Sequence, residues 1–211
     1  MKFAGHQHYG ELVSDLFDAQ APGYDEDLFH PLVAGTLIDG LSPEPALLVD
    51  VATGTGAAAF AALRLAPASV LAVDFSPAMI ERAREKAAQL DPEGRIRWQV
   101  ATAVPLPVGD GEADAVVCAS ALHFLGATAL AEWRRVLRPG GRLAFSISLA
   151  SRLRREGAMG ELMPKDLRIP ATVEEAAALA TDAGFHRATA RVVTSDRGDR
   201  IRQVFAVFAE A

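Results

Sequence analysis

The sequence predicts an α/β protein in which a parallel sheet carries helices on both faces. From about Ala46 onward, short apolar runs alternate with patterns of helical spacing. This alternation is typical of strands and helices wound around a parallel sheet. The chain then closes with two successive strands joined by SDRGDR, a segment whose Gly and Asp residues favour a hairpin turn. One strand of this hairpin must therefore run antiparallel to its neighbour.

The predicted strands are mostly continuous apolar runs, as expected of strands that are buried on both faces. The third strand is the exception, because it alternates and places Ile96, Trp98 and Val100 on one face. In chain order, we expect strands at Leu47–Val51, Val70–Asp74, Arg95–Ala101, Ala113–Ala119, Arg142–Ser148, Arg187–Thr194 and Arg202–Ala209.

A first helix is predicted to begin at Ser76-Pro77, with Ser76 as the N-cap and Pro77 at the first helical position. The turn-forming residues 91–94 end it. Its buried face is predicted from the apolar residues that recur at helical spacing, namely Met79, Ile80, Ala83, Ala87 and Leu90.

Two further helices follow from the same signals. Leu130, Trp133 and Leu137 mark one helix, which Pro139-Gly140-Gly141 is expected to terminate. The other is predicted at Thr172–Ala183, with Thr172 as the cap, Glu three residues later, and Gly just past the end.

Composition narrows the class of protein. The 211 residues suffice for one domain, and no apolar run approaches the roughly 18 residues of a membrane span. The net charge of −6 argues against a nucleic-acid partner, since that affinity comes largely from clustered Lys and Arg. Cys118 is the single cysteine, which excludes an internal disulfide framework, and the five histidines show no metal-ligand spacing. Because MKFAGHQHYG has no apolar signal core, we expect a cytoplasmic protein without a membrane partner. We also expect a monomer or a homodimer.

The stretch LLVDVATGTGAAAF, at Leu47–Phe60, carries the first indication of a ligand. Its Gly54-Thr55-Gly56 turn formally fits the loose dinucleotide fingerprint G-x-G-x-x-A. However, Asp50 stands at the strand end, where its carboxylate would repel a pyrophosphate. The same carboxylate suits a ligand that carries an ammonium group. A nicotinamide-dependent oxidoreductase, using NAD or NADP, is therefore only a remote alternative.

A second carboxylate follows the next strand. Asp74 is placed to accept two hydrogen bonds from ribose hydroxyls. An ammonium-bearing amino acid joined to a ribonucleoside describes S-adenosylmethionine, which we therefore expect as the cofactor. Phe75 is predicted to lie either on the adenine face or in the core, and Met79 either in the core or against the cofactor.

Four ordered segments together resemble the class I S-adenosylmethionine-dependent methyltransferases: DVATGTG, VDFSPAMIERAREKA, VPLPVGDGEADAVVCASALHFL and EWRRVLRPGGRLAFSI. They are most similar to the small group that includes the ubiquinone and menaquinone C-methyltransferases. The resemblance covers about Phe17 to Ala209. It implies a Rossmann-like, doubly wound sheet of seven strands with a reversed last strand. It also implies a small-molecule acceptor and the product S-adenosylhomocysteine.

The resemblance also implies individual roles. Asp50, Gly54 and Gly56 match the motif that passes the methionine part of the cofactor, and Asp74 matches the acid that binds the ribose. Three residues depart from the pattern: Ala52 replaces a frequent glycine, Thr53 a frequent cysteine, and Thr102 the acid that commonly reaches the adenine amino group. Tyr24, in the segment Ala21–Asp25, matches a tyrosine that lies over the cofactor or else belongs to a turn. The remaining expected cofactor contacts, at the ends of the third and fourth strands, are Ala103 and Ser120.

Methyl transfer from a sulfonium is an in-line displacement that needs no metal, so positioning of the acceptor supplies most of the acceleration. His123, just past the fourth strand, is the one candidate general base, with an ordinary pKa near 6.5. The alternative is that His123 only forms part of the wall. A further alternative for the whole chain is a methyltransferase-like protein that binds the cofactor without methylating, which Ala52 and Thr102 keep open.

We expect a single methyltransferase domain with four parts. They are an N-terminal helical lid (1–45), a cofactor-binding core (46–150), a short cap (151–171), and a C-terminal helix with its hairpin (172–211). The cap carries several Arg and Lys residues, which either face an acidic substrate or form a solvated surface.

Overall fold

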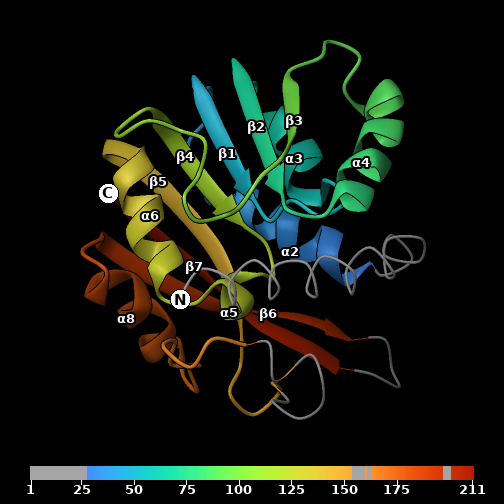
Figure 1. Ribbon diagram of the computed structural model, residues 1–211. Coiled ribbons are helices and arrows are strands. Elements are labelled where there is room, and N and C mark those ends of the chain that lie inside the picture. Colours follow the sequence, from blue (N-terminus) through green and yellow to red (C-terminus); the bar gives the residue numbers. More distant parts are fainter. Residues whose placement is uncertain (1–27, 154–159, 161–162, 197–200) are drawn as a thin grey trace, which may run out of the picture.

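A computed structural model describes residues 28–153, 160, 163–196 and 201–211. Within these residues a single seven-stranded sheet has the order β3-β2-β1-β4-β5-β7-β6 (Figure 1). Strands β1 to β5 pair in parallel, and β7 is antiparallel to both of its neighbours. The strands are β1 (Leu47–Val51), β2 (Ser69–Asp74), β3 (Ile96–Val100), β4 (Ala113–Cys118), β5 (Leu137–Ser148), β6 (His186–Asp196) and β7 (Ile201–Glu210). The predicted fold class, including the reversed last strand, is confirmed.

Helices cover both faces of this sheet. One apolar core unites α6 and α8 with the face that carries Val49 and Val51, and Trp133 and Phe145 pack there at a ring separation of 5.8 Å. The other core unites α2 and α3 with the opposite face, which carries Leu48. Neighbouring residues of β1 thus serve different cores, as the alternation of a strand requires. The helices described are α2 (Phe29–Ile38), α3 (Ala57–Ala62), η2 (Leu63–Leu65, a 3-10 turn), α4 (Pro77–Leu90), α5 (Leu122–Leu125), α6 (Thr128–Val136) and α8 (Val173–Asp182).

The local signals for helix starts are confirmed. The Ser76 hydroxyl accepts a hydrogen bond from the Met79 N–H at 3.0 Å, and the Thr172 hydroxyl accepts one from the Glu175 N–H at 3.2 Å. Gly184 follows α8 with φ +86°, the left-handed conformation that favours glycine.

The predicted end of α6 is wrong by several residues. The helix ends at Val136, and Leu137 is already extended and paired with Ala113 of β4. Pro139-Gly140-Gly141 therefore lies inside β5 rather than between a helix and a strand. The reason is a partner far away in sequence, because the Gly140 N–H donates to the Ala211 carbonyl at 2.9 Å and the Ala211 N–H donates to the Gly141 carbonyl at 2.9 Å.

The predicted buried face of α4 is correct only for its first half. Met79, Ile80 and Ala83 are buried, whereas Ala87 is half-buried and Leu90 is 52% exposed. Fourteen helical residues extend about 21 Å, but the five residues of β3 extend only about 17 Å. The last turn of α4 therefore projects past the strand on which the helix packs.

Two predicted features lie wholly or partly outside the described residues. Residues 197–200 of the hairpin turn and residues 1–27 of the proposed lid belong to the undescribed part. The described remainder of the lid contains α2, which packs against β5 and β7 on one face of the sheet. No helix among the described residues has both the length and the apolar character needed to cross a membrane.

Candidate functional site

The chain turns sharply after β1. Ala52, Gly54 and Gly56 all adopt left-handed backbone conformations, with φ values of +53°, +55° and +91°. Glycine reaches this region without strain, whereas an alanine there costs about 1–2 kcal/mol. The turn is anchored to the neighbouring strand, because the Thr53 N–H donates to the Val73 carbonyl of β2 at 3.0 Å. This geometry explains why a glycine is the easier residue at position 52.

Gly56 has a packing role that the sequence motif does not reveal. A Cβ atom at this position would lie 2.6 Å from the Trp98 ring and 2.9 Å from the Phe60 ring. The two rings contact each other at a centroid separation of 5.2 Å. Glycine at position 56 therefore lets an aromatic pair close against the start of α3.

Asp74 joins the ends of β1 and β2. Its Oδ2 accepts a hydrogen bond from the Gly54 N–H at 2.8 Å, and its Oδ1 accepts one from the Ser76 N–H at 2.9 Å. A carboxylate offers about four acceptor positions, which is more than these two backbone bonds use. The predicted bonds to ribose hydroxyls are compatible with this arrangement and stay a prediction.

The carboxyl group of Asp50 is almost completely buried, with 1% of the residue exposed. Its Oδ2 accepts a hydrogen bond from the Thr53 hydroxyl at 2.6 Å, and its Oδ1 has no hydrogen-bond partner among the described residues. Burial raises the pKa of this carboxyl to about 7, an effect that the Thr53 bond and the nearby Ala59 backbone N–H oppose and the negative charge of Asp74 reinforces. The Ala59 N–H does not meet the geometry of a hydrogen bond to Oδ1. A cation placed against Oδ1 would stabilise the ionised form.

The end of β4 presents two further polar atoms without partners. Ser120 adopts φ +64°, and its N–H donates to the hydroxyl of Ser146 on β5 at 2.7 Å. The Ser120 hydroxyl itself and Nδ1 of His123 are buried and have no partner among the described residues. No described residue uses the hydrogen-bonding capacity of these two atoms.

His123 lies in α5, with its ring 4.2 Å from that of Phe124. Burial lowers the pKa of this imidazole to about 4. The ordinary pKa that the sequence analysis assumed is therefore wrong, because burial is a property of the folded chain. At neutral pH the ring is uncharged and is a weak base.

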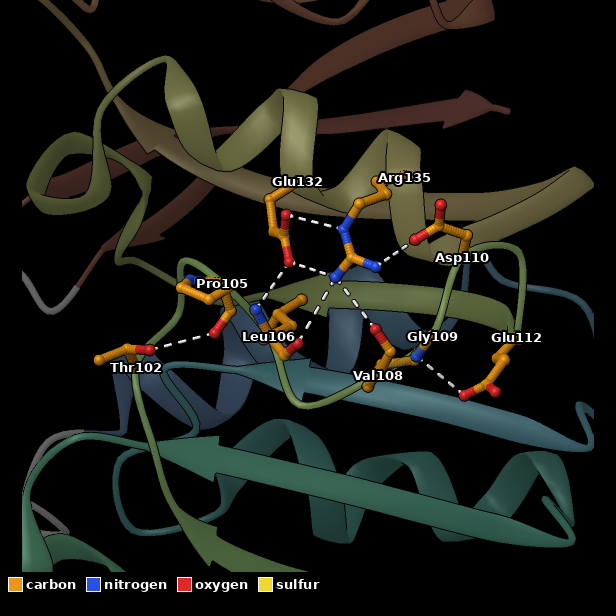
Figure 2. Close-up of polar contacts among 9 residues, drawn as sticks. All are labelled: Thr102, Pro105, Leu106, Val108, Gly109, Asp110, Glu112, Glu132 and Arg135. Carbon is orange, nitrogen blue, oxygen red and sulfur yellow. Dashed lines mark hydrogen bonds and ion pairs between the residues drawn. The ribbon is translucent and has the colours of Figure 1, made fainter.

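The connection between β3 and β4 contains Thr102 and Ala103. Thr102 is exposed and its hydroxyl donates to the Pro105 carbonyl at 3.0 Å, which leaves the oxygen able to accept (Figure 2). Ala103 is half-buried against the apolar core.

Two residues of α6 hold this connection in place. Arg135 donates to the carbonyl of Val108 at 3.0 Å and to the carboxylate of Asp110 at 2.6 Å (Figure 2). The Glu132 carboxylate accepts from the same guanidinium at 2.6 Å and from the Leu106 N–H at 2.7 Å. The guanidinium keeps the pKa of Glu132 below its usual range. Sequence reasoning missed both residues, although Glu and Arg three apart on a helix gave a usable signal.

The predicted site residues thus fall into three groups. Hydrogen bonds link Asp50 with Thr53, and Gly54 with Asp74, at the ends of β1 and β2. Ser120 and His123 follow β4, which pairs directly with β1. Phe75 is half-buried, Met79 is buried as a core residue would be, and Tyr24 lies outside the described residues.

A family model described as "methyltransferase domain" matches residues 48–141, the segment that supplies these strand ends. Over this segment the chain is similar to methyltransferase domains. Among curated proteins it is similar to the demethylmenaquinone methyltransferase of Deinococcus radiodurans, with 36% identity over 153 residues, which is 66% of this chain and 61% of that protein. It is also similar to the ubiquinone/menaquinone biosynthesis C-methyltransferase of Geotalea daltonii, with 34% identity over 151 residues, 64% of this chain and 63% of that protein. The chain thus spans about three fifths of the length of these relatives.

Solved structures share the fold of this chain. One similar chain comes from the complex between the Haloferax volcanii Trm112 methyltransferase activator and a methyltransferase. It matches with a TM-score of 0.75 and 21% identity, over 92% of this chain and 97% of that one. A SAM-dependent methyltransferase from Aquifex aeolicus matches with a TM-score of 0.65 and 21% identity, again over 92% of this chain and 97% of that one. The expected resemblance to class I methyltransferases is confirmed.

Replacing Arg135 with Met tests its role in holding the β3–β4 connection. We expect the free energy of unfolding to fall by about 1–3 kcal/mol, because the Glu132 carboxylate loses its charged partner. Urea denaturation measures this change, and limited proteolysis within residues 102–112 should become faster. The matched control is Arg97→Met at an exposed position of β3, which should change stability by less than about 0.5 kcal/mol. Equal effects of the two substitutions would contradict the assignment.

Replacing Ser146 with Ala removes the acceptor for the Ser120 N–H. We expect a loss of about 1 kcal/mol or more in urea denaturation, because a partly buried donor is left without its partner. Ser148→Ala is the control, since Ser148 lies two residues further on the same strand and face, and it should be nearly neutral. A neutral Ser146→Ala variant would show that the hydrogen bond does not maintain the conformation of Ser120.

Proposed function

We propose that this protein is an S-adenosylmethionine-dependent methyltransferase that transfers a methyl group in line to a small-molecule acceptor. The observation that carries the proposal is the unpartnered Oδ1 of Asp50, buried beside a left-handed glycine turn at the end of β1. A buried acid without a partner is costly, and a ligand ammonium group offsets that cost. The match to a methyltransferase domain and the relatives named as methyltransferases support the same conclusion.

The residues present fit such a cofactor. Asp50 would hold the ammonium group, Asp74 would accept the ribose hydroxyls, and the hydroxyl oxygen of Thr102 would accept from the adenine amino group. Phe75 and Ala103 lie at the strand ends on either side, and the free hydroxyl of Ser120 adds a donor near the methionine part. When bound, S-adenosylmethionine supplies an electrophilic methyl group on a sulfonium.

The task of the protein is then positioning rather than acid or metal chemistry. Holding two reactants in line is worth up to about 7–11 kcal/mol of the barrier. Ser120 and His123 follow β4, beside the strand that carries Asp50, so they face the region where an acceptor approaches. With its low pKa, the His123 ring is neutral, and its unpartnered Nδ1 can accept a hydrogen bond from an acceptor hydroxyl.

Several finer points belong to the proposal. The relatives are named for demethylmenaquinone and for ubiquinone/menaquinone biosynthesis, so an aromatic quinol is the first acceptor to test. The net charge of −6 supports the absence of a nucleic-acid partner. A cytoplasmic location and a monomeric or homodimeric state complete the proposal.

The two other functions are less well supported. A nicotinamide-dependent oxidoreductase would place a pyrophosphate near the Asp50 carboxylate, which repels it. A protein that binds the cofactor without methylating shares every contact described above. Only the detection of a methylated product separates it from an enzyme.

Titration with S-adenosylhomocysteine tests the proposed cofactor. This ligand should raise the melting temperature by mass action, whereas NAD and NADP should not. Binding should also release close to one proton at pH 6, because Asp50 is largely protonated in the free protein and becomes ionised against the ammonium group. Calorimetry in two buffers of different ionisation enthalpy measures this release, which should vanish at pH 8, above the pKa of about 7.

Asp50→Asn should weaken S-adenosylhomocysteine binding at least tenfold and abolish the proton release, since hydrogen bonds to charged groups are worth about 1.5–3 kcal/mol. Asp182→Asn, at the exposed end of α8, is the control and should preserve both. A melting shift with NADH and none with S-adenosylhomocysteine would overturn the proposed function.

The substitution His123→Asn separates positioning from base catalysis. We expect KM for the acceptor to rise while kcat stays within a few-fold, because a neutral imidazole with a low pKa contributes mainly a hydrogen bond. A plot of kcat against pH should show no transition near pH 6.5, the ordinary pKa of histidine. His186→Asn, exposed on β6, should leave both constants unchanged. A hundredfold fall in kcat at constant KM would instead identify His123 as the general base.

A further inference from the structure

A groove with a volume of about 570 Å³ lies at the end of the sheet opposite to Ser120 and His123. It is formed where α2 ends, at Asp39 and Gly40, and it runs over the middle of β5, the first half of β6 and the end of β7. Figure 1 shows this separation, with the C-terminus beside the start of β5 and α5 at the other end of that strand. The groove is therefore distinct from the candidate cofactor site.

One part of the groove floor is apolar, within a lining that is otherwise polar and charged. Phe208 lies beneath Gly40 so closely that a Cβ atom on this glycine would fall 2.1 Å from the ring. Ala190 and Ala209 also line the groove. An apolar body of small size would find a matching surface here.

Three arginines surround this floor. Arg142 and Arg187 both donate to the same oxygen of Glu210, Oε2, at 3.1 and 3.0 Å. Arg191 donates to the Thr36 carbonyl at 3.3 Å, and its guanidinium lies 5.4 Å from the centre of the Phe208 ring. Each guanidinium has five N–H donors and uses one of them in the hydrogen bond given above. Most of the donors therefore have no acceptor among the described residues.

The local charge is positive, although the whole chain is acidic. The negative charge of Glu210 neutralises one of the three arginine charges. The negative charge of Asp39 is already paired with Arg64 at 2.6 Å. Two positive charges thus remain among the described residues of the groove, on a chain with a net charge of −6. Guanidinium groups bind carboxylate and phosphate in paired hydrogen bonds, which makes them the usual recognition groups for such anions.

The backbone at Arg187 is strained in a way that the ion pair does not explain. A β-bulge lies between His186 and Thr189, and within it Arg187 adopts φ +51°. Bulges commonly turn a side chain toward a functional position. The Arg187 side chain is 77% exposed, and an ion pair so exposed contributes little to stability.

We propose that this groove is a second binding site, which takes a small organic anion: a carboxylate or phosphate attached to an apolar body. The anion is bound by Arg142, Arg187 and Arg191, and the apolar body lies on Phe208. This proposal does not depend on the identity of the cofactor or of the methyl acceptor.

Titration of the ¹⁵N-labelled full-length chain with benzoate, followed by NMR, tests the proposal. We expect the amide signals of Gly40, Ala190 and Phe208 to shift together, with a Kd on the order of 1 mM for so small a ligand. Inorganic phosphate, which lacks the apolar body, should bind more weakly, and benzyl alcohol, which lacks the charge, should not bind. Added salt should weaken benzoate binding.

Matched variants decide whether the arginines are responsible. Arg191→Gln should weaken benzoate binding about tenfold or more, and the Arg187→Gln, Arg191→Gln double variant should abolish it. Arg97→Gln, an exposed position of β3 at the other edge of the sheet, should bind benzoate like the parent protein. Unchanged binding in the double variant, or benzoate shifts confined to amides outside the groove, would overturn the proposal. Equal binding of phosphate and benzoate would overturn the assignment of an apolar body.

Discussion

The carboxylate of Asp74 is the contact on which the candidate site depends. It receives one N–H from Gly54, in the turn after β1, and another from Ser76, the N-cap of α4, so a single side chain joins two separate connections of the chain. A carboxylate accepts such backbone bonds strongly, because the acceptor is charged. The neighbouring carboxyl of Asp50 then lies buried beside a turn whose shape is already determined. The two acids are close enough for their charges to interact, and that repulsion is one reason why Asp50 is poised to bind a cation.

Around this contact, the site is built from backbone geometry more than from specialised side chains. The left-handed conformations at Ala52, Gly54 and Gly56 produce the sharp turn of the chain after β1. Ser120 adopts a similar conformation after β4. Two of these positions have an identified neighbour that stabilises them: a pair of aromatic rings packs beside Gly56, and a serine hydroxyl accepts from the Ser120 N–H. The rigidity of the site therefore comes from packing and hydrogen bonds that lie behind the residues expected to touch the ligand.

Local signals in the sequence predicted much of this arrangement, and their limits have a physical cause. The strand ends, the caps at Ser76 and Thr172, and the glycine turn depend on residues within a few positions of one another. The end of α6 depends instead on pairing with Ala211, and the partner of Ser120 is a serine 26 residues away, so neither is visible in a local pattern. The pKa of His123 depends on burial, which a sequence does not display. Glu132 and Arg135 were visible as a helical pair, but the loop that they hold was not.

The position of β7 has a consequence for how the sheet is completed. This strand is the last in the sequence, yet it occupies an interior place between β5 and β6. As the chain emerges during synthesis, β5 carries an open edge and β6 has no neighbour to join until the final strand is available. The sheet is therefore completed when β7 inserts between β5 and β6, and not by the addition of a strand at its edge. Chains that stop before β7 should expose two unpaired strands at once, a state prone to intermolecular strand pairing.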